Sequence, residues 1–183
     1  MTENFRDLTG IMDALWRRLE EGAHVADSPA RNLSLATSGP DGAAVRLVVL
    51  RGADRATASL TFYTHAHSGK IAHLEHTPKA QLLLWDPASN FQARLSAHIT
   101  MTPGTKQIWE TLTRGARLNY ATDPLPGTLM RDPAAHAPTP DPGLLTVLTA
   151  RIETIDLLHL GALPHARALF SREDEFRGQW IAP

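Results

Sequence analysis

The pattern of apolar and polar positions begins with a helical period. Between residues 11 and 21, apolar residues recur on one side of a helix, as at Leu15 and Leu19, and Gly22 follows as a stop signal. Trp16 lies beside this apolar stripe, and because aromatic side chains bury large areas we expect it to pack against the core. The sequence therefore predicts a helix over about residues 11–21 that lies against the rest of the protein.

After residue 31 the apolar residues recur with the period of two that is typical of strands. Turn residues separate the first three runs, which predicts a meander of three strands. A helix is expected to begin at Ser68, an N-cap residue type, and to end before Pro78. Segment 144–158 is either a strand pair or one long bent strand. The other expected strands cover residues 32–37, 44–52, 58–64, 80–86, 91–99, 165–171 and 176–183, and a second short helix covers about 104–112.

A segment rich in proline and turn residues, at about 121–142, interrupts this series of strands. Runs typical of strands lie on both sides of it, so we interpret it as a surface excursion within a single domain covering residues 1–183. About six to eight mostly antiparallel strands with a few short helices at their connections indicate an α+β protein. The predicted fold class is mostly antiparallel β with peripheral helices, closed into a barrel or a strongly curved sheet.

The composition narrows the class of protein. Of the 183 residues, 43% are apolar and 20% are charged, which is typical of a folded globular protein. The net charge of −1 argues against a nucleic-acid binder, because phosphate contacts need an excess of basic residues. The absence of cysteine excludes disulfides and thiolate nucleophiles. No signal-peptide pattern and no apolar run of roughly 18 residues is present, so we expect a cytoplasmic protein with no membrane partner.

Two groups of residues place positive charge where it can bind an anion: the arginines of a β-rich run and the lysine at the start of the predicted second helix. Arg46 and Arg51 are five positions apart in a β-rich run, so on a regular strand they point to opposite faces unless a bulge intervenes. An arginine in such a run lies on a solvated face or has an anionic partner, because an unpaired buried charge is costly. Ser68 and Lys70 fall in the first turn of the predicted helix, where free N–H groups favour an anion such as phosphate.

Four histidines, His65, His67, His73 and His76, fall close together in the sequence and raise the alternative of a metal site. No cysteine and no suitably placed carboxylate completes a ligand set, so we predict no metal site and histidines that face solvent. The chain also lacks the glycine-rich fingerprint of dinucleotide-binding folds, the P-loop, and the Gly-x-Ser-x-Gly elbow of hydrolases.

Three segments, in this order, resemble the pyridoxamine 5′-phosphate oxidase family of flavin mononucleotide (FMN) proteins. The segment Arg46–Arg51 (RLVVLR) is similar to the family's Arg-x-Val-Leu-Leu-Lys strand. The segment Phe62–Lys70 (FYTHAHSGK) is similar to its Phe-Tyr-Thr strand, which runs through three variable residues into Ser-Arg-Lys. Gln92 begins a later strand at a spacing that matches the family without gaps. The resemblance covers about residues 30–118, and more loosely 144–183.

This resemblance implies a split β-barrel of the FMN-binding type and a homodimer that holds FMN in the crevice between its subunits. It also implies a small-molecule substrate, with no nucleic-acid partner. The cofactor-binding residues that it implies are Arg46, Leu47, Val48, Val49, Arg51, Tyr63, Thr64, Ser68, Lys70, Gln92 and Arg167, with Gln92 reaching across the dimer. The implied substrate-binding residues are Arg114 and His165, and His165 is also the candidate catalytic acid or base.

The chain departs from the family pattern on both sides of the implied site. Gly69 replaces the arginine of Ser-Arg-Lys, and Leu158 stands about where the family has a flavin-contacting tryptophan. On the substrate side, Leu118 replaces a serine and Leu163 an arginine, and leucine cannot donate hydrogen bonds to a phosphorylated substrate. We therefore predict an FMN-dependent oxidoreductase with a divergent substrate. The alternatives are a non-catalytic flavin or haem binding or sensor protein on the same barrel, and a genuine pyridoxamine 5′-phosphate oxidase.

Overall fold

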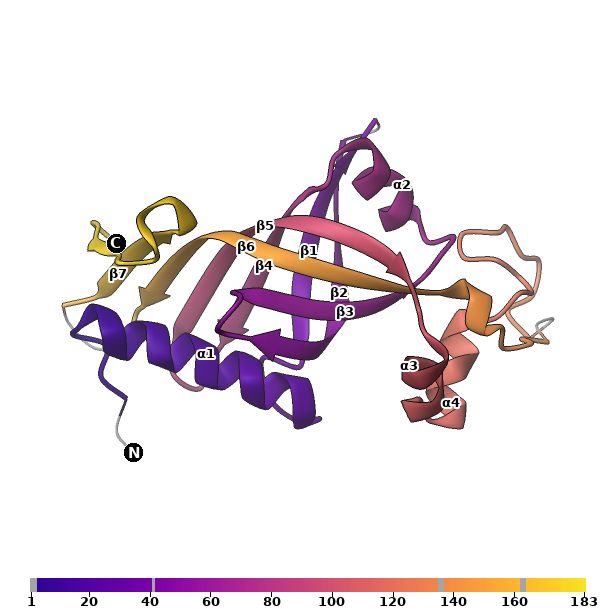
Figure 1. Cartoon of the computed structure of the whole chain (residues 1–183), viewed down its shortest axis with the longest axis horizontal. Coiled ribbons are helices and arrows are strands. Elements are labelled where there is room, and N and C mark those ends of the chain that lie inside the picture. The colour runs from indigo at the N-terminus through magenta and orange to yellow at the C-terminus, as the bar shows by residue number, and fades with distance from the viewer. Residues whose placement is uncertain (1–2, 41, 135–136, 162–163) are drawn as a thin grey trace.

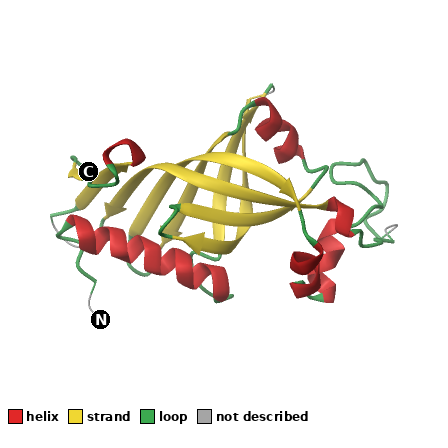
Figure 2. Cartoon of the chain, in the orientation of Figure 1, coloured by secondary structure: helices red, strands yellow, loops and turns green. Residues whose placement is uncertain are grey.

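The strands form one antiparallel sheet in a computed structural model that describes residues 3–40, 42–134, 137–161 and 164–183. The strand order is β3-β2-β1-β4-β5-β6-β7-β8, and β3 also pairs with β6. This last pairing closes six strands into a barrel, and β7 and β8 continue the sheet beyond β6 (Figure 1). The helices lie around the barrel and at its connections (Figure 2). The prediction of a mostly antiparallel split barrel with peripheral helices is confirmed.

The observed elements follow the predicted series closely, and the segment at 144–158 is one long strand. The strands are β1 (Asn32–Gly39), β2 (Gly42–Asp54), β3 (Ser59–His65), β4 (Lys79–Asp86), β5 (Phe91–Pro103), β6 (Leu145–His159), β7 (Ala166–Ser171) and β8 (Gln179–Trp180). The helices are α1 (Leu8–His24), α2 (Gly69–His76), α3 (Lys106–Thr111) and α4 (Arg114–Arg117), with 3-10 turns η1 (Leu118–Tyr120), η2 (Pro142–Leu144) and η3 (Arg172–Asp174).

Alternate side chains along each strand fill the barrel interior. Leu33 and Leu35 of β1, for example, belong with Phe91 of β5 to one continuous apolar core. A six-stranded barrel is narrow enough for such side chains to fill it. The register leaves Arg51 of β2 and Glu153 of β6 as the extra residues of two β-bulges. Because a bulge shifts the alternation by one residue, both long strands can bend and still present apolar residues to the core.

Helix α1 is longer than the predicted range of 11–21. It begins at Asp7, whose carboxylate accepts a hydrogen bond from the backbone N–H of Gly10 at 2.6 Å and thereby caps the first turn. Gly22 does not end the helix, and its role is close packing. A Cβ atom at Gly22 would lie 2.6 Å from the backbone of Ala30, so glycine lets the following loop fold back against the helix. Trp16 is buried, as expected.

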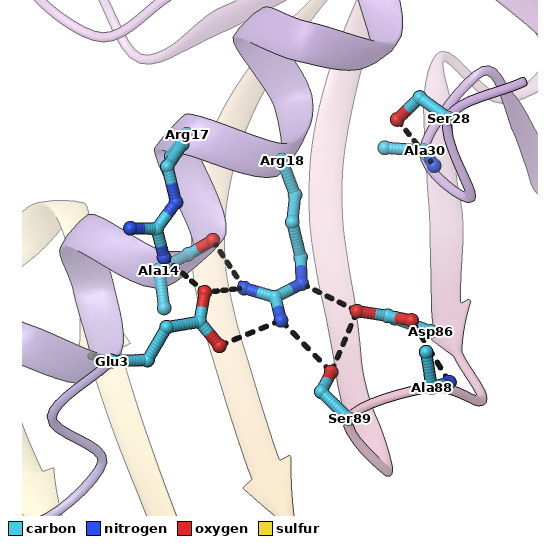
Figure 3. A network of polar contacts seen from close by, with 9 residues as sticks. All are labelled: Glu3, Ala14, Arg17, Arg18, Ser28, Ala30, Asp86, Ala88 and Ser89. Atoms are coloured by element: carbon cyan, nitrogen blue, oxygen red, sulfur yellow. Dashed lines mark hydrogen bonds and ion pairs between the residues drawn. The ribbon is translucent and has the colours of Figure 1, made fainter. Parts of the chain in front are cut away.

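An ion-pair network holds the N-terminal segment and α1 against the end of the barrel (Figure 3). The guanidinium of buried Arg18 donates to Asp86 Oδ2 at 2.9 Å, to both carboxylate oxygens of Glu3 at 2.6 and 2.9 Å, and to Ser89 Oγ at 2.8 Å. The hydrogen bond from Arg18 holds the pKa of Glu3 below its usual value. Because Asp86 ends β4 and Ser89 lies in the turn before β5, the network also ties this turn to α1.

The last strand and helix α3 are both shorter than predicted. The last strand was expected over 176–183, but only Gln179–Trp180 pairs with β7. Glu175 and Phe176 have positive φ angles of 59° and 57°, so the chain turns sharply there and cannot continue as a strand. Helix α3 is shorter than the expected 104–112. Its start is set by Thr105, whose hydroxyl oxygen accepts a capping hydrogen bond from the N–H of Ile108. Among the described helices, none is long and apolar enough to cross a membrane.

The two ends of the excursion at 121–142 lie next to each other. Ala121 forms an isolated bridge with Pro140, and the N–H of Asp141 donates to the carbonyl of Tyr120 at 2.8 Å. The Nε2 atom of His65 lies 3.0 Å from the carbonyl oxygen of Ala121. The base of the excursion is therefore fastened to the end of β3, next to the candidate site. Its residues 135 and 136 lie outside the described part of the chain.

Candidate functional site

Positive and hydroxyl side chains meet where β3 leads into α2. Lys70 Nζ donates to Thr64 Oγ1 at 2.8 Å and to Ser68 Oγ at 3.2 Å, and the two hydroxyl oxygens lie 3.1 Å apart. Because both oxygens accept from Lys70, at least one hydroxyl hydrogen stays free to donate to a ligand. Ser68 occupies the predicted N-cap position of α2, but its side chain makes no capping hydrogen bond. The first-turn N–H groups of α2 therefore have no side-chain acceptor from Ser68.

Arg46 adds a second positive charge to this group. Its Nη1 atom donates to Thr37 Oγ1 at 2.6 Å and to the Leu35 carbonyl at 3.3 Å, so the guanidinium lies toward the inner face of the barrel end. Burial lowers the pKa of Lys70 below its ordinary value of 10.5, and the nearby charge of Arg46 lowers it further. Burial also lowers the pKa of Arg46.

Arg46, Thr64, Ser68 and Lys70 together form what we call the Lys70 cradle. Among the residues that the structure describes, no carboxylate pairs with Lys70 or Arg46. Two half-buried like charges without an acid destabilise the folded protein, and a bound dianion relieves that repulsion. Cationic, hydroxyl and helix N-terminal donors that converge in this way suit a phosphate group.

Arg51 is the bulged residue of β2, and it lies beside Tyr63 instead of in the cradle. Its guanidinium lies 5.7 Å from the centroid of the Tyr63 ring. Burial raises the pKa of Tyr120, and the charge of Arg51 acts on it in the opposite direction, so these three side chains are neighbours. Tyr63 also packs on the small apolar cluster that contains Tyr120 and Leu112. This cluster forms an aromatic and positively charged wall outside the barrel.

The backbone between the two arginines carries a mixed set of side chains. Val48 is buried in the core, whereas Leu47 is 68% exposed on the outer face and Val49 is half-buried. Leu47 lies opposite Ser34 in the register of β1 and β2. The outer face of this stretch is therefore apolar at Leu47 and Val49.

Gln92 and Arg167 lie in a second group of predicted site residues. The register aligns Gln92 of β5, Leu158 of β6 and Arg167 of β7 in one row across the outer face. Trp85 of β4 continues the row on the other side of Gln92 and is 43% exposed. Arg167 donates to both carboxylate oxygens of Asp156, at 3.0 and 2.9 Å, and these bonds lower the pKa of Asp156. We call Trp85, Gln92, Leu158 and Arg167 the Gln92 row.

The cradle and the row lie far apart within one chain. Thr64 of β3 pairs with Thr146 of β6, which in turn pairs with Pro103 at the end of β5. Gln92 lies at the other end of β5, near its start. Strands rise about 3.3 Å per residue, so the separation along β5 is on the order of 35 Å. Figure 1 shows the same arrangement, with α2 and α4 toward one end of the barrel and β7 toward the other.

The two predicted substrate residues are separated in the same way. Arg114 is the first residue of α4, at the cradle end, whereas His165 directly precedes β7 and acts electrostatically on His159 at the opposite end. Leu118 is 46% exposed at the start of η1, close to the cradle end. Leu163 lies outside the described residues. One chain therefore does not bring Arg114 and His165 together.

Two of the clustered histidines have internal partners instead of facing solvent. His65 is buried, with Nδ1 accepting from the N–H of His67 at 3.0 Å and Nε2 directed at the Ala121 carbonyl. His73 Nδ1 lies 3.1 Å from Thr37 Oγ1. Within the described ranges, no group of three or more histidine, aspartate or glutamate side chains could hold a metal ion. The expectation of solvent-facing histidines is wrong for these two, because the excursion and the β1–β2 hairpin cover them.

Sequence reasoning missed Thr37, and it named His73 only as one of four clustered histidines, not as a partner of Thr37. Thr37 follows Leu33 and Leu35 in the inward alternation of β1, and a polar residue in phase with buried leucines signals an internal hydrogen bond. His73 lies three positions after Lys70, which places both on one side of a helix. Both signals are readable in the sequence, although neither identifies the partner.

Comparisons with known proteins agree with this geometry. A family model described as "Pyridoxamine 5'-phosphate oxidase, FMN-binding domain" matches residues 13–103, which include the Lys70 cradle and Gln92. No curated protein matches the chain. The chain is similar to the solved structure of a pyridoxamine 5′-phosphate oxidase-related, FMN binding protein from Nostoc punctiforme PCC 73102. The two are 26% identical with a TM-score of 0.78, and the match covers 93% of this chain and 96% of that one.

More distant solved structures share the fold. PhzG from Burkholderia lata 383, solved in complex with tetrahydrophenazine-1-carboxylic acid, is 19% identical with a TM-score of 0.75, covering 94% of this chain and 92% of PhzG. A protein from Clostridium acetobutylicum related to general stress protein 26 is 13% identical with a TM-score of 0.60, covering 92% and 98% of the two chains. At these identities the likeness concerns the barrel alone.

Proposed function

Because the chain belongs to the pyridoxamine 5′-phosphate oxidase-like family of FMN-binding split barrels, we propose that it binds FMN and acts as an FMN-dependent oxidoreductase. The observation that carries this proposal is the Lys70 cradle, in which two cations and two hydroxyls converge without a carboxylate among the described residues. A phosphate monoester is dianionic near neutral pH and accepts several charge-assisted hydrogen bonds, so the cradle fits the FMN phosphate.

The outer face of β2 suits the flavin ring. Leu47 and Val49 offer apolar surface, and Arg51 at the bulge offers positive charge beside Tyr63. When bound, FMN supplies the group that accepts and returns electrons, while the protein orients it and tunes it with hydrogen bonds and charge. In this proposal Arg46, Ser68 and Lys70 hold the phosphate, and Arg51 and Tyr63 lie near the ring.

The proposal includes a homodimer with the flavin at its interface. One chain separates the cradle from the Gln92 row, whereas a second copy could place its own Gln92 and Arg167 beside the first copy's cradle. Exposed apolar side chains on the outer face of β2 and β4 support such an interface, because large exposed apolar patches mark association surfaces. These side chains are Val45, Leu47, Leu83 and Trp85, with exposed fractions of 68%, 68%, 38% and 43%.

The proposed substrate is a small molecule other than pyridoxamine 5′-phosphate. Arg114 and Leu118 lie at the cradle end, and the exposed leucine offers no hydrogen bond where a phosphorylated substrate needs one. His165 from a second copy is the candidate acid or base, since it lies at the opposite end of its own chain. The excursion at 121–142 is fastened beside this region and would shape the substrate side.

A binding experiment tests this function directly. Purified protein is expected to bind FMN with a perturbed flavin absorption spectrum and a raised melting temperature, and to bind riboflavin, which lacks the phosphate, more weakly. Light scattering is expected to give twice the 20.0 kDa chain mass. Equal affinity for FMN and riboflavin would contradict the phosphate assignment. A flavin-loaded dimer whose flavin exchanges no electrons with any donor or acceptor would favour a binding or sensor role.

Restoring the family's arginine at position 69 is expected to strengthen FMN binding about fivefold, as one added charge-assisted contact at a half-exposed site predicts. A Cβ atom at Gly69 meets nothing within 4 Å, and its φ is not positive, so the larger side chain fits without strain. The measurement compares FMN and riboflavin affinities of Gly69→Arg and Gly69→Gln by fluorescence titration. An equal gain with glutamine, or a gain shared by riboflavin, would show that the added charge does not face the phosphate.

A further inference from the structure

A hydrogen-bonded relay connects helix α2 to Arg46. His73 Nδ1 lies 3.1 Å from Thr37 Oγ1, and the same oxygen accepts from Arg46 Nη1 at 2.6 Å. An arginine can only donate, so Thr37 keeps its own hydroxyl hydrogen for the histidine ring. When Nδ1 carries no hydrogen, Thr37 donates to it and thereby becomes a better acceptor for Arg46, since hydrogen bonds in a chain polarise one another.

The surroundings fix each member of this relay. Thr37 is 2% exposed and continues the inward alternation of β1 at the end of the barrel. The His73 ring lies against Gly39, where a Cβ atom would approach the ring to 2.6 Å. A glycine at position 39 is therefore what admits the imidazole between α2 and the β1–β2 hairpin. His73 is three residues after Lys70, so one face of α2 presents the lysine to the cradle and the imidazole to the relay.

We infer that His73 is a positioning residue for the cofactor phosphate, which acts through Thr37 to hold Arg46 toward Lys70; the inference rests on the proposed function. Arg46 has four rotatable side-chain torsions and no carboxylate partner in the described chain. Without the relay its guanidinium would keep only the longer hydrogen bond to the Leu35 carbonyl, at 3.3 Å, and would be freer to move away from Lys70. The repulsion between the two cations, which adds to the effect of burial in lowering the pKa of Lys70, acts in that direction. The relay keeps both charges directed at one phosphate group.

The test measures the ratio of the riboflavin dissociation constant to the FMN dissociation constant. Because the two ligands differ only by the phosphate, this ratio reports how much the phosphate contributes to binding. His73→Leu, which keeps volume but removes the acceptor, is expected to lower the ratio about tenfold, the size typical of a hydrogen bond that orients a charged group. His73→Asn keeps an acceptor close to the Nδ1 position and is expected to retain the ratio. Asparagine has a lower helix propensity than leucine. If the variants acted only by destabilising α2, His73→Asn would therefore lower the ratio more than His73→Leu.

Two further variants separate positioning from packing. In a Thr37→Val background, which already breaks the relay, His73→Leu is expected to change the ratio no further. Gly39→Ala leaves His73 in the chain but displaces its ring, so it is expected to lower the ratio as His73→Leu does. An unchanged ratio in both His73→Leu and Gly39→Ala would overturn the inference while leaving FMN binding intact. A wild-type protein that does not prefer FMN over riboflavin would overturn the proposed function and this inference together.

Discussion

Replacing Lys70 by methionine is expected to weaken FMN binding about 100-fold and to leave riboflavin binding unchanged. Lys70 contacts both cradle hydroxyls, at 2.8 and 3.2 Å. Loss of a charge-assisted contact to phosphate corresponds to about 2–3 kcal/mol. Methionine keeps the length and apolar stem of lysine without its charge. Fluorescence titration with FMN and with riboflavin measures both affinities on the same protein samples.

The same substitution is expected to stabilise the flavin-free protein or leave its stability unchanged. Burial and the charge of Arg46 lower the pKa of Lys70, so the charged lysine is less favourable in the folded than in the unfolded chain. This penalty is fully present below the folded-state pKa and disappears as the pH rises toward the unfolded value of 10.5, because the unfolded chain then binds more protons. The stability gain of the methionine variant is therefore largest near neutral pH and shrinks at alkaline pH.

Lys79→Met is the matched control, because Lys79 is exposed at the start of β4 and is not part of the cradle. It is expected to change neither the FMN to riboflavin preference nor the melting temperature appreciably. A Lys70→Met protein that is strongly destabilised without ligand would mean that the lysine is a structural residue. A variant that loses riboflavin and FMN affinity equally would place Lys70 away from the phosphate.

The strand pattern was predictable because one barrel face is apolar and the other is solvated. Leu33 and Leu35 alternate with polar residues along β1, and that alternation alone identifies both the strand and its buried side. Helix ends were harder to predict, because they depend on distant contacts. Gly22 does not end helix α1; it is a glycine because the backbone of Ala30 packs where its side chain would be. The bulges at Arg51 and Glu153 are also non-local, since they exist only in relation to the partner strand.

The candidate site divides in the same way into a local part and a part set by strand register. Thr64, Ser68 and Lys70 lie within seven consecutive residues at a strand-to-helix junction, so their convergence follows from local geometry. The alignment of Gln92 with Leu158 and Arg167 depends on which strands pair and in which register. No periodicity reports that pairing, and only the resemblance to a family supplied it. The acceptors Thr37 and Asp156 were missed because each is defined by a partner from another strand.

Replacing Arg18 by methionine is expected to lower the free energy of unfolding by about 3–5 kcal/mol, the largest stability change among the substitutions considered. The guanidinium is nearly inaccessible and contacts Glu3, Asp86 and Ser89 together (Figure 3). It also lies 4.6 Å from the centroid of the Phe91 ring. Its loss leaves the buried Asp86 carboxylate without a cation. Chemical denaturation followed by circular dichroism measures the change.

Arg17→Met is the matched control for Arg18→Met. Arg17 also contacts Glu3, but its side chain is 42% exposed, so the expected loss is below about 1 kcal/mol. Equal losses in the two variants would mean that the Arg18 network contributes no more than a surface ion pair. The double variant Arg18→Met/Asp86→Asn is expected to recover part of the loss, because it removes the unpaired charge. The asparagine oxygen can still accept from the N–H of Ala88, and its NH2 group can donate to the Ser89 hydroxyl, which accepts as well as donates.

The pH dependence provides an independent check on the Arg18 network. Hydrogen bonds from Arg18 hold the pKa of Glu3 below 4.5; for Asp86, bonds from Ser89 and Arg18 outweigh the opposing effect of burial and hold its pKa below 3.8. Carboxyl groups with lowered folded-state pKa values contribute stability that is present above their unfolded values and is lost as the pH falls through the folded ones. The wild-type protein therefore loses this contribution in acid, whereas Arg18→Met has already lost most of it. The stability difference between the two proteins is expected to be full at pH 7 and to shrink below about pH 4, and a difference that grows in acid would contradict the assignment.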